Sequence, residues 1–317
     1  MNLAIHSEIN PLRLVITHRP GIEHKYITPS NLVEKVQKDS VLINNPNYLL
    51  FDDLIHAEKA QEEHEKLYYI LHHFTDGNCF ELMDLFKTII NDEKIKKSII
   101  KECIAVEEKL YNNKIKLDKL INLKSNDLTD VLLSGYYKNL KLFSYPIPNL
   151  IFTRDIAVCI GNTALITWST KDVRIRENII AKYVLSNHPL FKNLKIYDFH
   201  EKHPGLNIEG GDIIVFDKKR ICIGISERTP IEAIEKISSV IFEEGFKKII
   251  AIDMPKKRAL MHLDTIFTRI SENEVLVFPP VLEDFSRSIY IFNNDGKKET
   301  ITNNNLADIL KNDGLDI

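Results

Sequence analysis

The chain has 317 residues, of which 44% are hydrophobic and 27% are charged, and its formal net charge is −3. A chain of this length can bury a large core, and the composition is typical of a globular protein. The nearly balanced charge argues against a nucleic acid or an anionic membrane surface as the partner. The first residues lack a basic stretch followed by an apolar one, and no apolar run approaches the roughly 20 residues that span a bilayer. We therefore expect a cytoplasmic protein.

Apolar runs and turn residues predict the elements of the first 83 residues. A strand is expected over 12–17, closed by a turn rich in proline and glycine. A helix is expected over 51–71, with the acidic pair Asp52-Asp53 in its first turn. After a break, residues 79–83 are interpreted as a second strand.

The next stretch has a different character. From residue 84 to about 139, lysine, glutamate, leucine and isoleucine alternate at helical spacing, and Gly135 is the first glycine. We interpret residues 84–142 as a helical insertion between a first module, 1–83, and the following modules, 143–317.

A repeated pattern of two strands, a helix and a third strand follows the insertion. The expected elements are 157–160, 164–168, 174–186 and 194–198 in one copy, 213–216, 221–225, 230–244 and 248–253 in the next, and 266–269 and 275–278 in a third. Units of roughly 50 residues bury their apolar faces by stacking on their neighbours, and ring closure is one solution. Asp155, Asp212 and Asp264 each begin a copy, so we expect these acids to converge near the axis.

A histidine and an acid stand close together at the start of the third copy. In an extended segment, His262 and Asp264 would project to the same face, which pairs a proton carrier with a fixed negative charge. Taken alone, such a pair is more often structural than catalytic.

Further polar residues are expected at the same point. Glu209 precedes Asp212, and Arg174 and Arg228 each follow the second strand of a copy. Carboxylates suit a guanidinium or another cation, and arginines suit an anionic end, so a zwitterion with a guanidinium tail fits both. Structural alternatives stay open: Gly210-Gly211 could be a plain turn, and Arg174 could pair with Glu177. Clustered carboxylates with one histidine do not favour a metal site.

These motifs resemble the arginine deiminase family. The resemblance rests on Asn-Leu-Ile-Phe-Thr-Arg-Asp (149–155), Asn-Ile-Glu-Gly-Gly-Asp (207–212), Ser-Glu-Arg-Thr (226–229) and Met-His-Leu-Asp-Thr (261–265), with His-Arg-Pro-Gly-Ile-Glu (18–23) and the predicted helix through His64 in its N-terminal part. It covers essentially the whole chain, and the combination is far more specific than any single motif.

The resemblance implies an α/β fold, a five-fold pseudosymmetric propeller of strand-strand-helix-strand modules with a helical insertion. It implies hydrolysis of L-arginine to L-citrulline and ammonia through a covalent cysteine intermediate, in arginine catabolism and without a cofactor. Carried over by motif, Asp155 and Asp264 would grip the guanidinium, and Glu209 would hold His262 as general acid and base. The substrate carboxylate would meet both arginines, Arg174 and Arg228, with Asn149 also lining the pocket.

The cysteines depart from the family pattern. The family nucleophile lies in a glycine-rich segment near the C-terminus, whereas no cysteine follows Cys222 here. Cys79, Cys103, Cys159 and Cys222 have no Cys-x-x-Cys spacing, so we expect neither a disulfide framework nor a zinc site, but reduced packing residues. We therefore expect no nucleophile in this chain and a propeller incomplete at its C-terminal end.

Three explanations compete for this departure: a fragment of a complete enzyme, a truncated product, or a non-catalytic protein that binds a guanidino ligand. An amidinotransferase or a hydrolase of another guanidine is a further alternative. Two arginines placed for a carboxylate argue against agmatine, which has none. The sequence leaves a homo-oligomer open.

Overall fold

The computed structural model describes residues 3–38, 40–45, 47–51, 53–282, 287–302 and 306–312. The chain forms two compact units, which are described separately. Unit 1 contains Met1–Pro11, Arg154–Thr170 and Asn193–Ile317, and unit 2 contains Leu12–Thr153 and Lys171–Lys192. Each unit combines segments from different parts of the sequence and does not correspond to one predicted module. The boundaries 1–83, 84–142 and 143–317 therefore stay a prediction.

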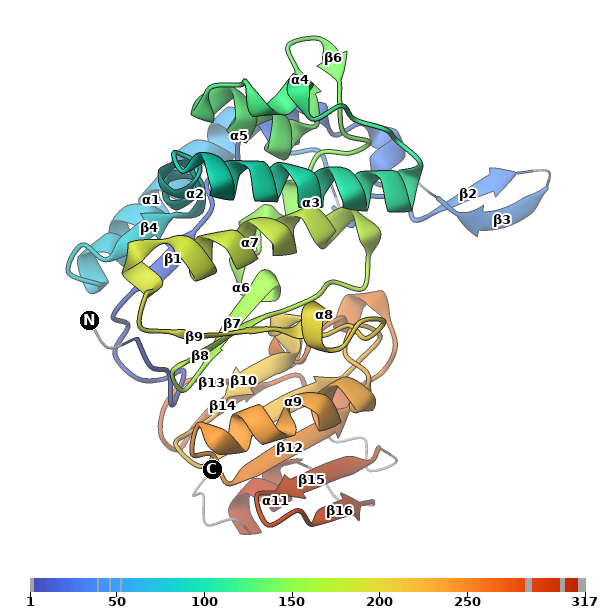
Figure 1. Cartoon of the computed structure of the whole chain (residues 1–317). Helices are drawn as coiled ribbons and strands as arrows, with labels where there is room; N and C mark the ends of the chain where they lie inside the picture. Colours follow the sequence, from blue (N-terminus) through green and yellow to red (C-terminus); the bar gives the residue numbers. More distant parts are fainter. Residues whose placement is uncertain are drawn as a thin grey trace. The chain divides into compact units, whose positions relative to one another are not determined.

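Unit 2 is mainly helical. Its longer helices are α1 (Ala57–Phe74), α2 (Leu82–Ile89), α3 (Glu93–Tyr111), α5 (Ser125–Ser134) and α7 (Ile175–Asn187), with the short α4 (Asp118–Ile121) before α5. Its strands are β1 (Val15–Thr17), β2 (Lys35–Lys38), β3 (Val41–Asn44), β4 (Cys79–Glu81), β5 (Tyr136–Tyr137) and β6 (Leu140–Lys141). β1 and β4 pair in parallel, while β2 and β3 form a hairpin that extends from the helices (Figure 1). Helices α2 to α5 confirm the predicted helical character of the stretch from residue 84.

Two helix starts in unit 2 differ from the prediction. Helix α1 begins at Ala57 instead of residue 51, because the His56 side chain accepts a hydrogen bond from Lys59 N and caps the helix there. Residues 53–56 are not helical, and Phe51 packs into a small apolar cluster with Leu49. Asp52, which was expected in the first turn, lies outside the described residues. The strand expected over 79–83 ends at Glu81, where α2 begins.

Unit 1 repeats one strand pattern. Its strands are β7 (Ala157–Ile160), β8 (Thr163–Ile166), β9 (Lys195–Asp198), β10 (Ile213–Val215), β11 (Arg220–Ile225), β12 (Lys248–Asp253), β13 (Phe267–Arg269), β14 (Val275–Val277), β15 (Ile289–Asn293) and β16 (Lys298–Ile301). β7 pairs antiparallel with β8, and β8 pairs parallel with β9; β10, β11 and β12 repeat this arrangement. With α7 and α9 (Ile231–Glu243) between the second and third strands in sequence, both predicted copies are confirmed. So is the α/β class.

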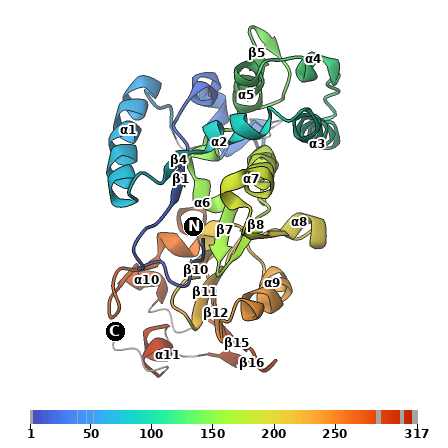
Figure 2. The same cartoon turned by 60° about the vertical axis from the view of Figure 1, so that its left-hand side comes forward.

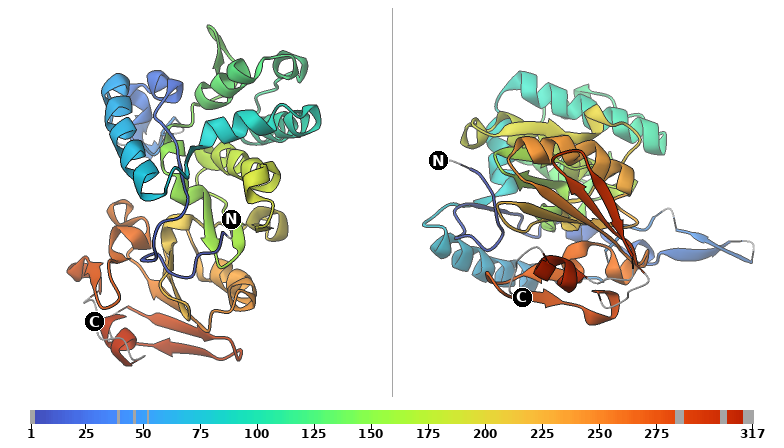
Figure 3. Two further views of the ribbon diagram at one scale, coloured as in Figure 1. Left: turned by 90° about the vertical axis from the view of Figure 1, so that its left-hand side faces the viewer. Right: turned by 90° about the horizontal axis from the view of Figure 1, so that it is seen from below.

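The largest sheet of unit 1 has its strands β10, β11 and β12 buried on both faces. Its strand order is β10-β11-β12-β15-β16 (Figure 3). Alternate side chains point to opposite faces: Ile221 and Ile223 pack with α9, whereas Cys222 and Ile250 pack with residues of α11 (Leu306–Asn312). Figure 2 shows α9 and α11 on opposite sides of the sheet. Each fully buried isoleucine contributes roughly 1.5–3 kcal/mol, so the sheet is a firm base for the loops at its ends.

Short helical turns and loops complete unit 1. The short helices are α6 (Thr153–Ile156), α8 (Phe199–Lys202) and α10 (Pro279–Leu282). Three 3-10 turns precede strands or loops of interest: Gly210–Asp212, Arg258–Leu260 and Leu263–Thr265. Among the described residues, no helix is both long and apolar enough to cross a membrane.

Candidate active site

His262 lies at the centre of a polar cluster in unit 1. Its backbone is extended, with φ −135° and ψ 159°, but Leu263–Thr265 forms a 3-10 turn. The prediction of an extended segment through Asp264 is therefore wrong beyond His262. The Thr265 side chain explains the turn, because its hydroxyl donates to the His262 carbonyl oxygen at 2.6 Å.

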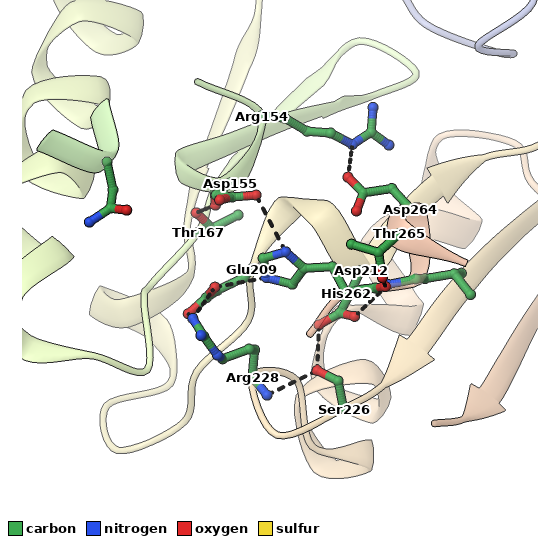
Figure 4. A network of polar contacts seen from close by, with 12 residues as sticks. Arg154, Asp155, Thr167, Glu209, Asp212, Ser226, Arg228, His262, Asp264 and Thr265 are labelled. Carbon is green, nitrogen blue, oxygen red and sulfur yellow. Dashed lines mark hydrogen bonds and ion pairs between the residues drawn. The ribbon is translucent and has the colours of Figure 1, made fainter. Parts of the chain in front are cut away.

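Two carboxylates flank the imidazole of His262 (Figure 4). Nε2 lies 2.9 Å from Glu209 Oε2, and Nδ1 lies 3.7 Å from Asp155 Oδ1. Burial favours the neutral imidazole, but the hydrogen bond to Glu209 and the charges of Asp155, Asp212 and Glu209 outweigh it and raise the pKa of His262 to about 9. His262 is therefore mostly protonated at neutral pH, which suits a proton donor.

Glu209 is fully buried and holds several groups at once. Besides His262, it accepts hydrogen bonds from Thr170 N at 2.9 Å and from Arg228 Nη1 at 3.1 Å. Two cationic partners offset the cost of burying this carboxylate. The bond to Nε2 also fixes the ring so that Nδ1 faces Asp155.

Asp264 forms the outer part of the cluster. Its side chain is 31% exposed, and Oδ2 lies 3.5 Å from Nε of Arg154. Burial raises the pKa of Asp264, while the positive charges of His262 and Arg154 act in the opposite direction. Asp155, which precedes β7 on α6, adds a second carboxylate beside His262. The two acids and the imidazole thus offer hydrogen-bond acceptors and a proton donor to one ligand.

Asp212 holds the backbone that follows His262 in place. Its Oδ1 accepts a hydrogen bond from Leu263 N at 3.1 Å, and its Oδ2 accepts one from the Ser226 hydroxyl at 2.7 Å. Burial raises the pKa of Asp212 to about 7, against the opposing effects of His262, Thr229 and Ser226. The backbone next to His262 is therefore fixed by a fully buried carboxyl group.

Two adjacent glycines make room for this cluster. A Cβ on Gly211 would lie 2.6 Å from His262 Nδ1 and 3.0 Å from Asp155 Oδ1, and one on Gly210 would lie 2.0 Å from the Arg154 carbonyl oxygen. Neither glycine has a positive φ, the backbone conformation for which turns commonly need glycine. Close packing, rather than backbone freedom, is what requires glycine here.

We expect Gly211→Ala to destabilise the fold by about 1–3 kcal/mol, because the added methyl group overpacks the site. It should also displace the imidazole, which is measured as a change in the His262 ring signals by NMR beside urea unfolding. Gly205→Ala is the control: no heavy atom lies within 4 Å of its Cβ position, and its φ of +92° costs backbone strain alone. Unchanged His262 signals in Gly211→Ala would contradict the close packing.

The other predicted site residues have partners of their own. Arg228 is 4% exposed and pairs with Glu209, while its Nε has no hydrogen-bond partner among the residues that the structure describes. Asn149 and Arg174 belong to unit 2, where Arg174 Nη2 donates to the Asn149 carbonyl oxygen at 3.2 Å and Nε donates to Glu177 at 2.9 Å. The pairing of Arg174 with Glu177, one of the alternatives from the sequence, is confirmed.

None of the four cysteines forms a ready thiolate. Burial raises the pKa of Cys79, that of Cys103 to about 12, that of Cys159 to about 11, and that of Cys222 above the normal range. A thiolate is the nucleophilic form of cysteine, so these environments disfavour covalent chemistry. No group of three or more His, Cys, Asp or Glu in the described part of the chain is arranged to hold a metal ion.

Sequence reasoning missed two supports of the site. Arg154 stands next to Asp155 in the same motif, but nothing in the pattern distinguishes a structural arginine from a ligand. Glu8 accepts a hydrogen bond from Arg154 Nη2 at 2.6 Å and comes from the segment around Ser7, where no motif pointed to the site. The role of Asp212 was also incompletely foreseen, because it was predicted only as one of the converging acids.

The fold and the cluster define an α/β protein with a histidine-centred, carboxylate-rich site. A family model described as arginine deiminase matches residues 132–313. The arginine deiminase of Staphylococcus aureus (strain MRSA252) is 31% identical over 323 residues, which cover 95% of this chain and 75% of that protein. That of Borrelia duttonii (strain Ly) is 32% identical over 317 residues, covering 92% and 72%. The chain belongs to the arginine deiminase family.

Solved structures give a fainter likeness. A complex of dimethylarginine dimethylaminohydrolase from Pseudomonas aeruginosa with citrulline matches with a TM-score of 0.33 and 24% identity, covering 41% of this chain and 47% of that one. The N-terminal domain of ArgZ, an arginine dihydrolase of cyanobacteria, matches with a TM-score of 0.35 and 20% identity, covering 42% and 45%. TM-scores of this size carry no argument about fold or function.

Proposed function

We propose that the chain binds L-arginine at the His262 cluster and that the protein hydrolyses it to L-citrulline and ammonia. Membership of the arginine deiminase family supports the reaction. The observation that carries the proposal is the imidazole of His262 held between Glu209 and Asp155, with Asp264 beside them. A guanidinium presents several N–H donors in one plane, and carboxylates are its natural acceptors.

In the proposed mechanism, Asp155 and Asp264 hold the guanidinium and His262 moves the protons. A thiolate adds to the guanidinium carbon, and the imidazolium of His262 protonates the departing nitrogen, which leaves as ammonia. The neutral imidazole then takes a proton from water as the water attacks the same carbon and expels the thiolate, giving citrulline. Glu209 keeps the His262 ring oriented in both steps.

We assign no nucleophile within this chain. All four thiols have raised pKa values, and Cys222 packs in the apolar core of the large sheet. Because of this observation, a guanidino-binding protein without turnover stays the second candidate function. The two functions share the ligand and differ only in the covalent steps.

Arg228, Arg174 and Asn149 are proposed to bind the substrate carboxylate. The buried Nε of Arg228 has no hydrogen-bond partner among the described residues. It supports this proposal, because it is a donor that an anion could use. Both arginines also take part in buried ion pairs, with Glu209 and Glu177 respectively, so a ligand would have to share these bonds. A carboxylate requirement favours arginine over agmatine.

The wider fold and setting are part of the proposal. We propose a five-bladed propeller of strand-strand-helix-strand modules, and the matching strand pairing of β7-β8-β9 and β10-β11-β12 supports it. A cytoplasmic role in arginine catabolism, without a cofactor, follows from the proposed reaction.

Asp264→Ala tests whether the Asp264 carboxylate binds the guanidinium of the ligand. We expect the affinity for L-arginine, measured by titration calorimetry, to fall about 30- to 100-fold, because a charge-assisted hydrogen bond is worth roughly 1.5–3 kcal/mol. Asp217→Ala is the control, since Asp217 pairs with Arg220 in a turn of the same unit. Unchanged affinity would refute the role of Asp264.

The unsubstituted protein separates the candidate functions. Citrulline release from arginine supports the hydrolase, whereas arginine binding without citrulline supports the guanidino-binding protein. No binding of arginine at all would overturn both. Faster turnover of agmatine than of arginine would overturn the substrate assignment.

A further inference from the structure

We infer that Arg154, anchored by Glu8 of the N-terminal segment, is a positioning residue that holds the Asp264 carboxylate in place for the guanidinium. This inference rests on the proposed function for the identity of the ligand. It deepens that function, because it adds a layer of residues behind the carboxylate that would contact the substrate.

The guanidinium of Arg154 joins three partners that come from separate parts of unit 1. Nε lies 3.5 Å from Asp264 Oδ2, and Nη2 lies 2.6 Å from Glu8 Oε1. Nη2 also donates to the Ile213 carbonyl oxygen at 2.5 Å. Figure 4 shows the Arg154 side chain reaching Asp264 from the side opposite His262. The two hydrogen bonds of Nη2 leave the guanidinium little freedom, and the ion pair at 3.5 Å, which is not a hydrogen bond, keeps its positive charge beside the Asp264 carboxylate.

Glu8 is itself anchored to the large sheet. Its Oε1 accepts a hydrogen bond from Val215 N at 3.0 Å, and its own backbone N donates to the Val215 carbonyl oxygen at 3.0 Å. The neighbouring Ser7 hydroxyl donates to the Phe216 carbonyl oxygen at 3.0 Å. The N-terminal segment thus follows the end of β10 and brings a fixed carboxylate to Arg154.

Charge explains why Asp264 needs such a support. The groups that act on it are the cations His262 and Arg154 and the carboxylates Asp155 and Glu8. Burial and the two neighbouring acids favour its neutral form, and a neutral carboxyl group is a poor acceptor for a guanidinium. His262 pairs with Glu209, whereas Nε of Arg154 lies within ion-pair distance of Asp264 itself.

The test compares Arg154→Met, Arg154→Lys and Glu8→Gln with the unsubstituted protein. The first readout is the titration of the Asp264 carboxyl carbon by NMR without ligand. We expect Arg154→Met to raise the pKa of Asp264, and Arg154→Lys, which keeps the charge, to restore much of the original titration. Arg220→Met is the matched control, because Arg220 also pairs with an acid, Asp217, in unit 1.

The second readout is the affinity for L-arginine by calorimetry at about pH 6 and about pH 8. Arg154→Met should weaken binding about tenfold at the lower pH and less at the higher one, since Asp264 then regains its charge. Glu8→Gln should have a smaller effect on binding, because loss of the anchor of Arg154 weakens binding while loss of the Glu8 charge lowers the pKa of Asp264. In the double variant the two effects should not add, because both residues act through one contact.

An identical Asp264 titration in Arg154→Met and the unsubstituted protein would overturn the inference. So would an equal loss of arginine affinity in Arg220→Met, which would point to a general loss of stability. If the unsubstituted protein binds no arginine, the proposed function fails, and the carboxyl titration still decides the positioning role.

Discussion

Glu209→Gln is expected to lower the free energy of unfolding by about 3–5 kcal/mol, although the two side chains have nearly the same shape. The substitution removes the anion that Arg228 and His262 share in a fully buried site. Removing one member of a buried ion pair leaves an uncompensated charge, and this is the costly event. Urea unfolding at pH 7 measures the loss.

Glu244→Gln is the matched control for this substitution. Glu244 is also mostly buried, but it bonds to Asn162 N, to the Thr163 hydroxyl and to the largely exposed Lys195. A glutamine can keep part of these bonds, so we expect a smaller loss. If both variants lose the same stability, the charges around Glu209 do not have the importance that we assign to them. In Glu209→Gln, the pKa of His262 should also fall toward its normal value.

His262→Ala is expected to change the pH dependence of stability as well as the chemistry. The folded-state pKa of about 9 lies above the normal 6.5, so the protonated imidazole stabilises the fold below pH 6.5. This contribution, on the order of 3 kcal/mol, is lost as the pH rises through about 9. The variant should lack the fall in stability between pH 7 and pH 9 that we expect for the unsubstituted protein.

Asp212 could produce a similar fall, because its pKa is also raised, from 3.8 to about 7, and its stabilising proton is lost as the pH rises to about 7. The charge of His262 lowers the pKa of Asp212, so the comparison is made with Asp212→Asn present in both proteins. His203→Ala is the control, because His203 bonds the Tyr197 hydroxyl in the same unit. The same fall above pH 7 in His262→Ala would contradict the assignment. Where the unsubstituted protein releases citrulline, His262→Ala should reduce the rate by about 10³-fold or more.

Much of the module pattern was predictable because it depends on local sequence. Strands β7 and β12 begin and end where the apolar runs do, and a turn at Gly161-Asn162 separates β7 from β8. The start of α1 was not predictable from its acidic residues, because a histidine cap and packing of Phe51 decided it. Tertiary contacts therefore overruled the local helix signal.

The candidate site was predictable to about the same extent as the fold. The convergence of Asp155, Glu209 and His262 followed from the repeat and is confirmed by their contacts within unit 1. What the sequence could not reveal is the choice of partners. Whether Arg228 pairs with Glu209 depends on burial and distance. The glycine pair does lie in a turn, Gly210–Asp212, but its close packing was not predictable, because a steric limit set by a distant imidazole has no local signature.

The discontinuous make-up of unit 1 has a consequence for how the protein is made. Glu8 and Val215 lie 207 residues apart in sequence, and Arg154 also follows long after Glu8. At roughly 5–20 residues per second, Glu8 is synthesised on the order of ten seconds before Val215. Closing so long a loop adds entropy cost and slows folding. Glu8 therefore cannot take its native place, or bind Arg154 there, until Val215 has been made.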